Sequence, residues 1–144
     1  MDILDKLGKA KPEKMSDQKA IEILKEWAEE LEVDSESKDF EDVIKALKIP
    51  VQKDKLKFIA ENRSFELVLF DPIEKHDGSK ISKLTIRSTT MAEKKGMQNF
   101  KESQRIDQSM LMISEACDLE LGFVERLKDK DLGRINAVVL GFLA

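Results

Sequence analysis

The chain has 144 residues, of which 41% are hydrophobic and 38% are charged. That length suits one domain with its own core, and the single cysteine excludes an internal disulfide. Aromatic residues make up only 6%, which argues against a carbohydrate cleft or a base-stacking platform, because both rely on exposed rings. No apolar run approaches the length of a membrane span, and the first residues do not resemble a secretory signal. The sequence therefore predicts a cytoplasmic protein.

Charge is distributed unevenly, although the formal net charge is only -4. Nine acidic residues and one basic residue lie between Glu26 and Asp42, whereas eight basic and three acidic residues lie between Lys75 and Arg105. Two solvated helix faces explain this pattern most simply. The alternative is a pair of complementary surfaces used in self-association or in docking a partner.

The first third of the chain predicts an arm followed by two helices. Residues 1–15 are expected to form the arm. Ser16 is a good helix cap, and apolar residues at helical spacing predict a helix over residues 17–32. Ser37 is expected to cap a second helix, which should end at Pro50. The sequence thus predicts residues 1–50 as an arm and a helical hairpin, attached to a second unit at 51–144.

After this hairpin the apolar period changes from helical to strand-like. Three strands are expected, with the second in the centre because both of its faces are apolar. Asp77-Gly78 predicts the turn between the second and third strands. The residues expected to share one face are Leu56, Phe58 and Ala60 in the first strand, Phe65, Leu67 and Leu69 in the second, and Ser82, Leu84 and Ile86 in the third.

Helices are expected to fill the remainder. Thr90 and Glu93 have the spacing of a capping box and predict a helix over residues 91–103. A denser helix and a short one should follow, and Asp129 or Asp131 should cap a final helix. The predicted fold is therefore α+β, with a small antiparallel three-stranded meander packed against a mainly α-helical remainder.

Residue types that carry chemistry are sparse. His76 is the only histidine and lies in a charged turn with no evident partner, so it is expected to be an exposed loop residue. The acidic run at 29–36 lacks the glycine and the terminal Glu of an EF-hand loop. The basic middle lacks a helix-turn-helix signature and interleaved aromatic residues, which argues against nucleic-acid binding. The sequence predicts no catalytic, cofactor or metal site, and no enzyme.

Two motifs in the second half carry a family resemblance. The first is "ISKLTIRSTT", a strand that passes directly into a helix, and the second is "LMISEACDLELGFVERLKDKDLGRINAVVLGFLA". In this order, over about residues 65–144, they resemble the phage tail assembly chaperone family. The matching residues are Leu84, Ile86, Arg87 and Thr90 in the first motif, and Leu119, Leu127, Asp131, Leu132, Phe142 and Leu143 in the second.

The resemblance implies a non-enzymatic protein that binds the helical tape measure protein in the host cytoplasm. It also implies that the protein helps recruit tail tube subunits and is absent from the mature particle. A chaperone for a long amphipathic helix needs an apolar groove, because the stripe of such a helix aggregates unless it is covered. The alternatives are a structural connector or baseplate protein of a phage tail or contractile injection system, and a nucleic-acid-binding regulator.

The final helix is the candidate partner-binding surface. Its stretch "INAVVLGFLA" has Asn136 as its only polar side chain, which is more apolar than one buried stripe requires. Either the helix is enclosed in the core, or a second face is covered by another copy of the chain or by the tape measure protein. The candidate partner-binding residues are Leu132, Ile135, Val138, Val139, Leu140, Phe142 and Leu143.

Overall fold

The computed structural model describes residues 15–92 and 105–143. Within these residues, two helices precede an antiparallel three-stranded sheet and three more follow it, which confirms the predicted α+β class. The predicted helix over 91–103 falls mostly on residues outside the described ranges. The elements are α2 (Asp17–Glu30), α3 (Lys38–Gln52), β1 (Leu56–Ile59), β2 (Ser64–Glu74), β3 (Lys80–Ile86), α5 (Arg105–Cys117), α6 (Leu121–Val124) and α7 (Asp129–Phe142).

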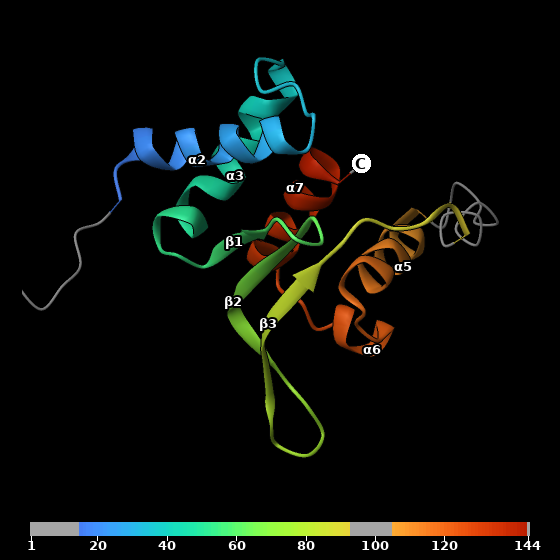
Figure 1. Ribbon diagram of the computed structural model, residues 1–144. Coiled ribbons are helices and arrows are strands. Elements are labelled where there is room, and N and C mark those ends of the chain that lie inside the picture. The colour runs from blue at the N-terminus through green and yellow to red at the C-terminus, as the bar shows by residue number, and fades with distance from the viewer. Residues whose placement is uncertain (1–14, 93–104, 144) are drawn as a thin grey trace, which may run out of the picture.

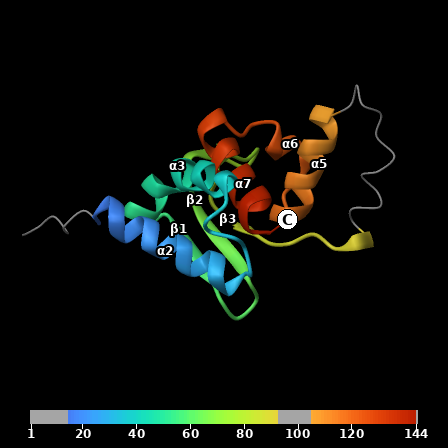
Figure 2. The same cartoon turned by 90° about the horizontal axis from the view of Figure 1, so that it is seen from above.

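Helix α7 is central to the molecule. It contacts α3 and α5 as well as strands β2 and β3. In both Figure 1 and Figure 2 it lies between the α2–α3 pair on one side and α5 on the other. The β2–β3 hairpin extends past the helices and ends in a turn away from them (Figure 1). The last helix is thus packed on several sides, and this decides which of its side chains reach solvent.

Both predicted serine caps are present. The Ser16 hydroxyl accepts a hydrogen bond from the backbone N–H of Lys19 at 3.1 Å, and the Ser37 hydroxyl accepts one from Phe40 at 3.3 Å. Each hydroxyl satisfies one of the N–H groups that have no partner within the helix at its first turn. The starts of α2 and α3 are therefore set locally, which is why the sequence predicts them well.

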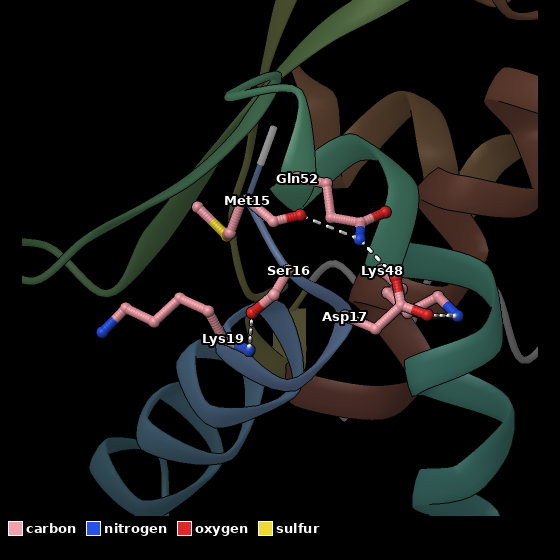
Figure 3. Close-up of polar contacts among 6 residues, drawn as sticks. All are labelled: Met15, Ser16, Asp17, Lys19, Lys48 and Gln52. Atoms are coloured by element: carbon pink, nitrogen blue, oxygen red, sulfur yellow. Dashed lines mark hydrogen bonds and ion pairs between the residues drawn. The ribbon is translucent and has the colours of Figure 1, made fainter. Parts of the chain in front are cut away.

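The predicted end of the second helix at Pro50 is wrong. Helix α3 continues to Gln52, because a proline in the last turn removes only one hydrogen-bond donor. The side-chain amide of Gln52 then donates to the backbone carbonyl of Met15 at 3.2 Å and to Asp17 Oδ1 at 2.5 Å (Figure 3). Lys48 Nζ adds an ion pair with Asp17 Oδ2 at 3.3 Å. These contacts join the end of α3 to the start of α2.

The sheet has the order β1-β2-β3, so the predicted central strand is confirmed. Leu67 lies opposite Leu56 on one neighbour and opposite Leu84 on the other. Leu84 and Ile86 are buried whereas Lys83 and Thr85 are exposed, as the alternation predicts. Strand β2 continues past Leu69 to Glu74, with a register irregularity against β3 between Val68 and Ile73.

A cluster of aromatic rings joins the α2–α3 pair to the sheet and to α7. The Trp27 ring lies 5.6 Å from Phe65 and 6.3 Å from Phe142, and the Phe142 ring lies 5.8 Å from Phe40 and 5.1 Å from Phe65. Buried side chains from both sides of residue 50 therefore form one core cluster. The division of the chain at residue 50 concerns how the two parts behave when separated, and it stays a prediction.

Candidate functional site

The structure separates the seven candidate residues of α7 into two groups. Four of them fill the core, namely Ile135, Val138, Val139 and Phe142. Leu132 and Leu143 are partly buried against that core, whereas Leu140 is 64% exposed. Val138, only two residues before Leu140, is fully buried. Leu140 is therefore the most exposed of the seven candidate residues.

Asp131 anchors the start of α7 to the sheet. Its buried carboxylate accepts hydrogen bonds from the backbone N–H groups of Phe70 at 2.8 Å and Asp71 at 3.0 Å. Both donors lie within the register irregularity of β2, where the regular pairing with β3 is interrupted. The prediction that Asp129 or Asp131 caps α7 is wrong, because the N-cap is Lys128 and makes no side-chain cap hydrogen bond. Asp131 instead bonds to a strand that is distant in sequence.

Two glycines of α7 face different surroundings. A Cβ atom on Gly141 would lie 2.5 Å from Cγ2 of Val43 on α3, so a larger residue at this helix contact would force Val43 or the helix to move. A Cβ atom on Gly133 would have nothing within 4 Å. The two helices therefore touch at Gly141 and leave open space beside Gly133.

This open space is part of a groove of about 580 Å³ between α3 and α7, which we call the α3–α7 groove. Leu140 and Ala137 line it from α7, and Val43 and Ala46 line it from α3. Its acidic side chains are Asp34, Asp39 and Asp42, and no Lys or Arg is among the described residues that line it. Leu140 also borders a smaller hollow of about 70 Å³ together with Met112 and Leu143. The groove thus combines apolar side chains with an acidic margin.

A second hollow of about 790 Å³ lies beside Trp27 on α2. Four carboxylate side chains line it together with the rings of Trp27 and Phe58. They are Glu26, Glu29, Glu30 and Glu32. No exposed aliphatic side chain comparable to Leu140 is among its described lining residues, so the α3–α7 groove is the better candidate for an apolar ligand.

Groups with reactive chemistry do not converge on the groove. His76 is exposed in the hairpin turn, as predicted. Cys117 is buried, and loss of hydration, with a smaller contribution from the Asp118 charge, raises the pKa of its thiol to about 12. Within residues 15–92 and 105–143, no cluster of three His, Cys, Asp or Glu side chains has the arrangement of a metal site. None of the helices described there is long and apolar enough to cross a membrane.

Arg87, one of the residues that carry the family resemblance, has a structural position. Its guanidinium pairs with the Asp118 carboxylate through Nη2 at 3.2 Å and Nε at 3.3 Å. Its backbone N–H donates to the carbonyl of Ala116 at 2.9 Å. Arg87 therefore joins the end of β3 to the end of α5, and this contact helps to place α5 beside α7.

Comparison with known protein families shows which family the chain belongs to. The family described as "phage tail assembly chaperone proteins, E, or 41 or 14" matches residues 66–144, more than half of the chain. The chain belongs to this family. The match runs from β2 to α7 and so includes Arg87, Asp131 and Leu140. Searches of the curated proteins and of the solved structures found no match.

Only one side of the α3–α7 groove of this tail assembly chaperone is therefore covered by the family match. Its α7 side lies within the residues that match the family, whereas α2, α3 and β1 precede them. The sequence predicted the importance of the last helix from its excess of apolar residues. It did not indicate that α3 forms the opposite side, because no local pattern encodes that contact.

Proposed function

We propose that this tail assembly chaperone binds the helical tape measure protein in the host cytoplasm and covers an amphipathic segment of it in the α3–α7 groove. The observation that carries the proposal is Leu140, which is 64% exposed on a helix whose other apolar residues are largely built into the core. A helix laid in a groove buries its apolar side chains against such a residue. Membership of the family supports the general role in tail assembly.

The size of the groove indicates how the chaperone would work. A volume of about 580 Å³ accepts a few side chains, so one copy covers only a short stretch of a long client helix. Many weakly bound copies would keep such a client soluble through multivalency and could still be displaced one at a time. Displacement by polymerising tail tube subunits would then leave the chaperone outside the mature particle. No catalytic step is required for this role.

Leu140→Asp tests the proposal, and Leu121→Asp is the matched control. Both leucines are exposed, at 64% and 45%, but Leu121 lies on α6, and it is not among the residues that line the groove. Each variant is co-expressed with the tape measure protein of the same phage, and the soluble complex is measured by co-purification. We expect Leu140→Asp to lose the complex while its melting temperature stays close to that of the wild type. Equal behaviour of the two variants would exclude the groove as the binding site.

Mass spectrometry of purified particles distinguishes the chaperone from a structural connector or baseplate protein. A chaperone is expected to be present during assembly and missing from the finished tail. Recovery of the chain in stoichiometric amount from intact particles would contradict the chaperone role and favour the structural one.

A further inference from the structure

We infer that the acidic margin of the α3–α7 groove selects a client helix that carries Lys or Arg beside its apolar stripe. The inference rests on the proposed function and adds the chemistry of the partner. Asp34, Asp39 and Asp42 line the groove, and all three are exposed. A helix seated on Leu140 would place its flanking side chains next to these carboxylates. Basic flanks would be attracted and acidic flanks repelled.

The carboxylates of Asp39 and Asp42 are available to a partner. Neither forms an ion pair with a residue in the described part of the chain. Asp34 is partly engaged, because its Oδ1 accepts a hydrogen bond from the backbone N–H of Glu36 at 3.0 Å. Of the three carboxylates that line the groove, Asp39 and Asp42 are thus the more available to a basic partner.

Acidic residues also predominate on the surface around the groove. Residues 26–42 contain nine acidic residues and one basic residue, and they form the end of α2, the connector and the start of α3. Acidic residues thus extend beyond the three that line the groove, and their charge favours the approach of basic partners. Because the groups are exposed, salt should screen this attraction strongly.

A second copy of this chain is the alternative ligand of the groove, because its basic segment between residues 75 and 105 carries the opposite charge. The described basic residues of that segment, such as Lys75, Lys80 and Lys83, lie on and beside the β2–β3 hairpin. On β3 the residues that share the side of Lys83 are Ile81, which is partly buried against the core, and Thr85, so this part offers no apolar stripe for Leu140. Lys83 is also already paired with Glu66 at 3.5 Å. An amphipathic helix with basic flanks fits the groove better.

The inference assigns different tasks to the two sides of the groove. Leu140 and Ala137 on α7 lie within the family match and supply apolar contact that any amphipathic helix can use. Asp39 and Asp42 on α3 precede the matched residues and supply the charge preference. Selectivity for the client would then be a property of the amino-terminal helices of this chain.

Two synthetic helical peptides test the charge preference. Both carry the same apolar stripe, and it is flanked by Lys in one peptide and by Glu in the other. Their binding to the full chain is measured by fluorescence anisotropy at low and at physiological salt. We expect the Lys peptide to bind about tenfold more tightly at low salt, with a smaller difference at high salt. Equal binding of both peptides, or a difference that salt does not change, would overturn the inference.

Paired substitutions locate the effect. Asp39→Asn with Asp42→Asn should reduce the preference for the Lys peptide, whereas Glu29→Gln with Glu30→Gln removes the same charge beside Trp27 and should leave it intact. A preference that follows the Glu pair would place the site in the hollow beside Trp27. Circular dichroism melts confirm that each variant is folded.

Two further outcomes separate the inference from the proposed function. Failure of both peptides to bind, or dimer formation that depends on Asp39 and Asp42, would overturn the inference. The proposed function survives either result if the tape measure protein still co-purifies with the wild type and not with Leu140→Asp.

Discussion

The carboxylate of Asp131 accepts a hydrogen bond from the backbone N–H of Phe70 at 2.8 Å across 61 residues of sequence. Asp131 is fully buried, and its second oxygen accepts from Asp71. A buried carboxylate is stable only when hydrogen bonds or opposite charges replace its hydration. Here two backbone N–H groups at an interruption of the β2–β3 ladder supply them. The carboxylate at the start of α7 and the backbone N–H groups in the middle of β2 thus satisfy each other's hydrogen-bonding requirement.

Asp131→Ala should lower the free energy of unfolding by about 3 kcal/mol, because it leaves two backbone donors unpaired in the interior. Asp129→Ala is the control, since Asp129 is exposed in the same turn of α7 and should matter by less than about 1 kcal/mol. Urea unfolding followed by circular dichroism measures both. Similar losses in the two variants would mean that Asp131 acts only through the helix dipole.

The two glycines of α7 should respond to alanine in opposite directions. Gly141→Ala forces Val43 or the helix to move and should cost about 1–3 kcal/mol. Gly133→Ala meets open space and should stabilise the helix by up to about 1 kcal/mol. Val43→Ala makes room, so the cost of Gly141→Ala should be smaller in that background, as a double-mutant cycle would reveal. Additive losses would argue against the contact.

Leu84→Asp should unfold the protein, because Leu84 is 4% exposed and an unpaired carboxylate would be buried there. Lys83→Glu is the neighbouring control on the exposed face. It should cost less than about 1 kcal/mol, although it replaces the ion pair with Glu66 by a repulsion. Thermal melts of the two variants check the register of β3. A wild-type melting temperature for Leu84→Asp is the result that would contradict it.

Cys117 should be inert in the folded protein. Its pKa of about 12 leaves almost no thiolate at neutral pH, and the side chain is buried. A thiol reagent should therefore react slowly in buffer and fast in urea. Between about pH 9 and pH 12 the unfolded chain loses this proton while the native chain keeps it, so stability should fall as pH rises. Cys117→Ala should remove that part of the pH dependence.

Deletion of residues 1–50 tests the proposed division of the chain. We expect the fragment 51–144 to keep helical and strand signals in circular dichroism. It should melt earlier than the full chain and bind an apolar dye, because Phe65 and Phe142 lose their contacts with Trp27 and Phe40. A spectrum without ordered structure would show that the two parts fold only together.

Features encoded by neighbouring residues were predictable from the sequence. The alternation in β3 and the serine caps of α2 and α3 depend on local spacing, and both are confirmed. The continuation of α3 past Pro50 was missed. The last residue of this helix, Gln52, makes its polar contacts with Met15 and Asp17 at the start of α2, and such distant partners cannot be predicted from local spacing. Distant partners also explain why the role of Asp131 was missed.

Contacts between distant elements also decide which residue of the candidate site is exposed. Val138 and Leu140 are both apolar and lie on opposite flanks of the main apolar stripe of α7, because residues two apart do not share a helix face. Periodicity therefore does not decide which flank is buried. The decision depends on α3, α5 and the sheet, which surround most of α7. Those neighbours enclose Val138 and leave Leu140 at the edge of the groove. The sequence could therefore predict the helix but not its exposed residue.

The ring contacts of Trp27 also have an optical consequence. The chain has one tryptophan and no tyrosine, so its emission on excitation at the indole band comes from a single side chain. That side chain touches Phe65 on the central strand and Phe142 at the end of α7. Separation of α2 from the rest would hydrate the indole and shift its emission to longer wavelength. The protein thus carries a native fluorophore that reports whether its amino-terminal helices stay attached, without any added label.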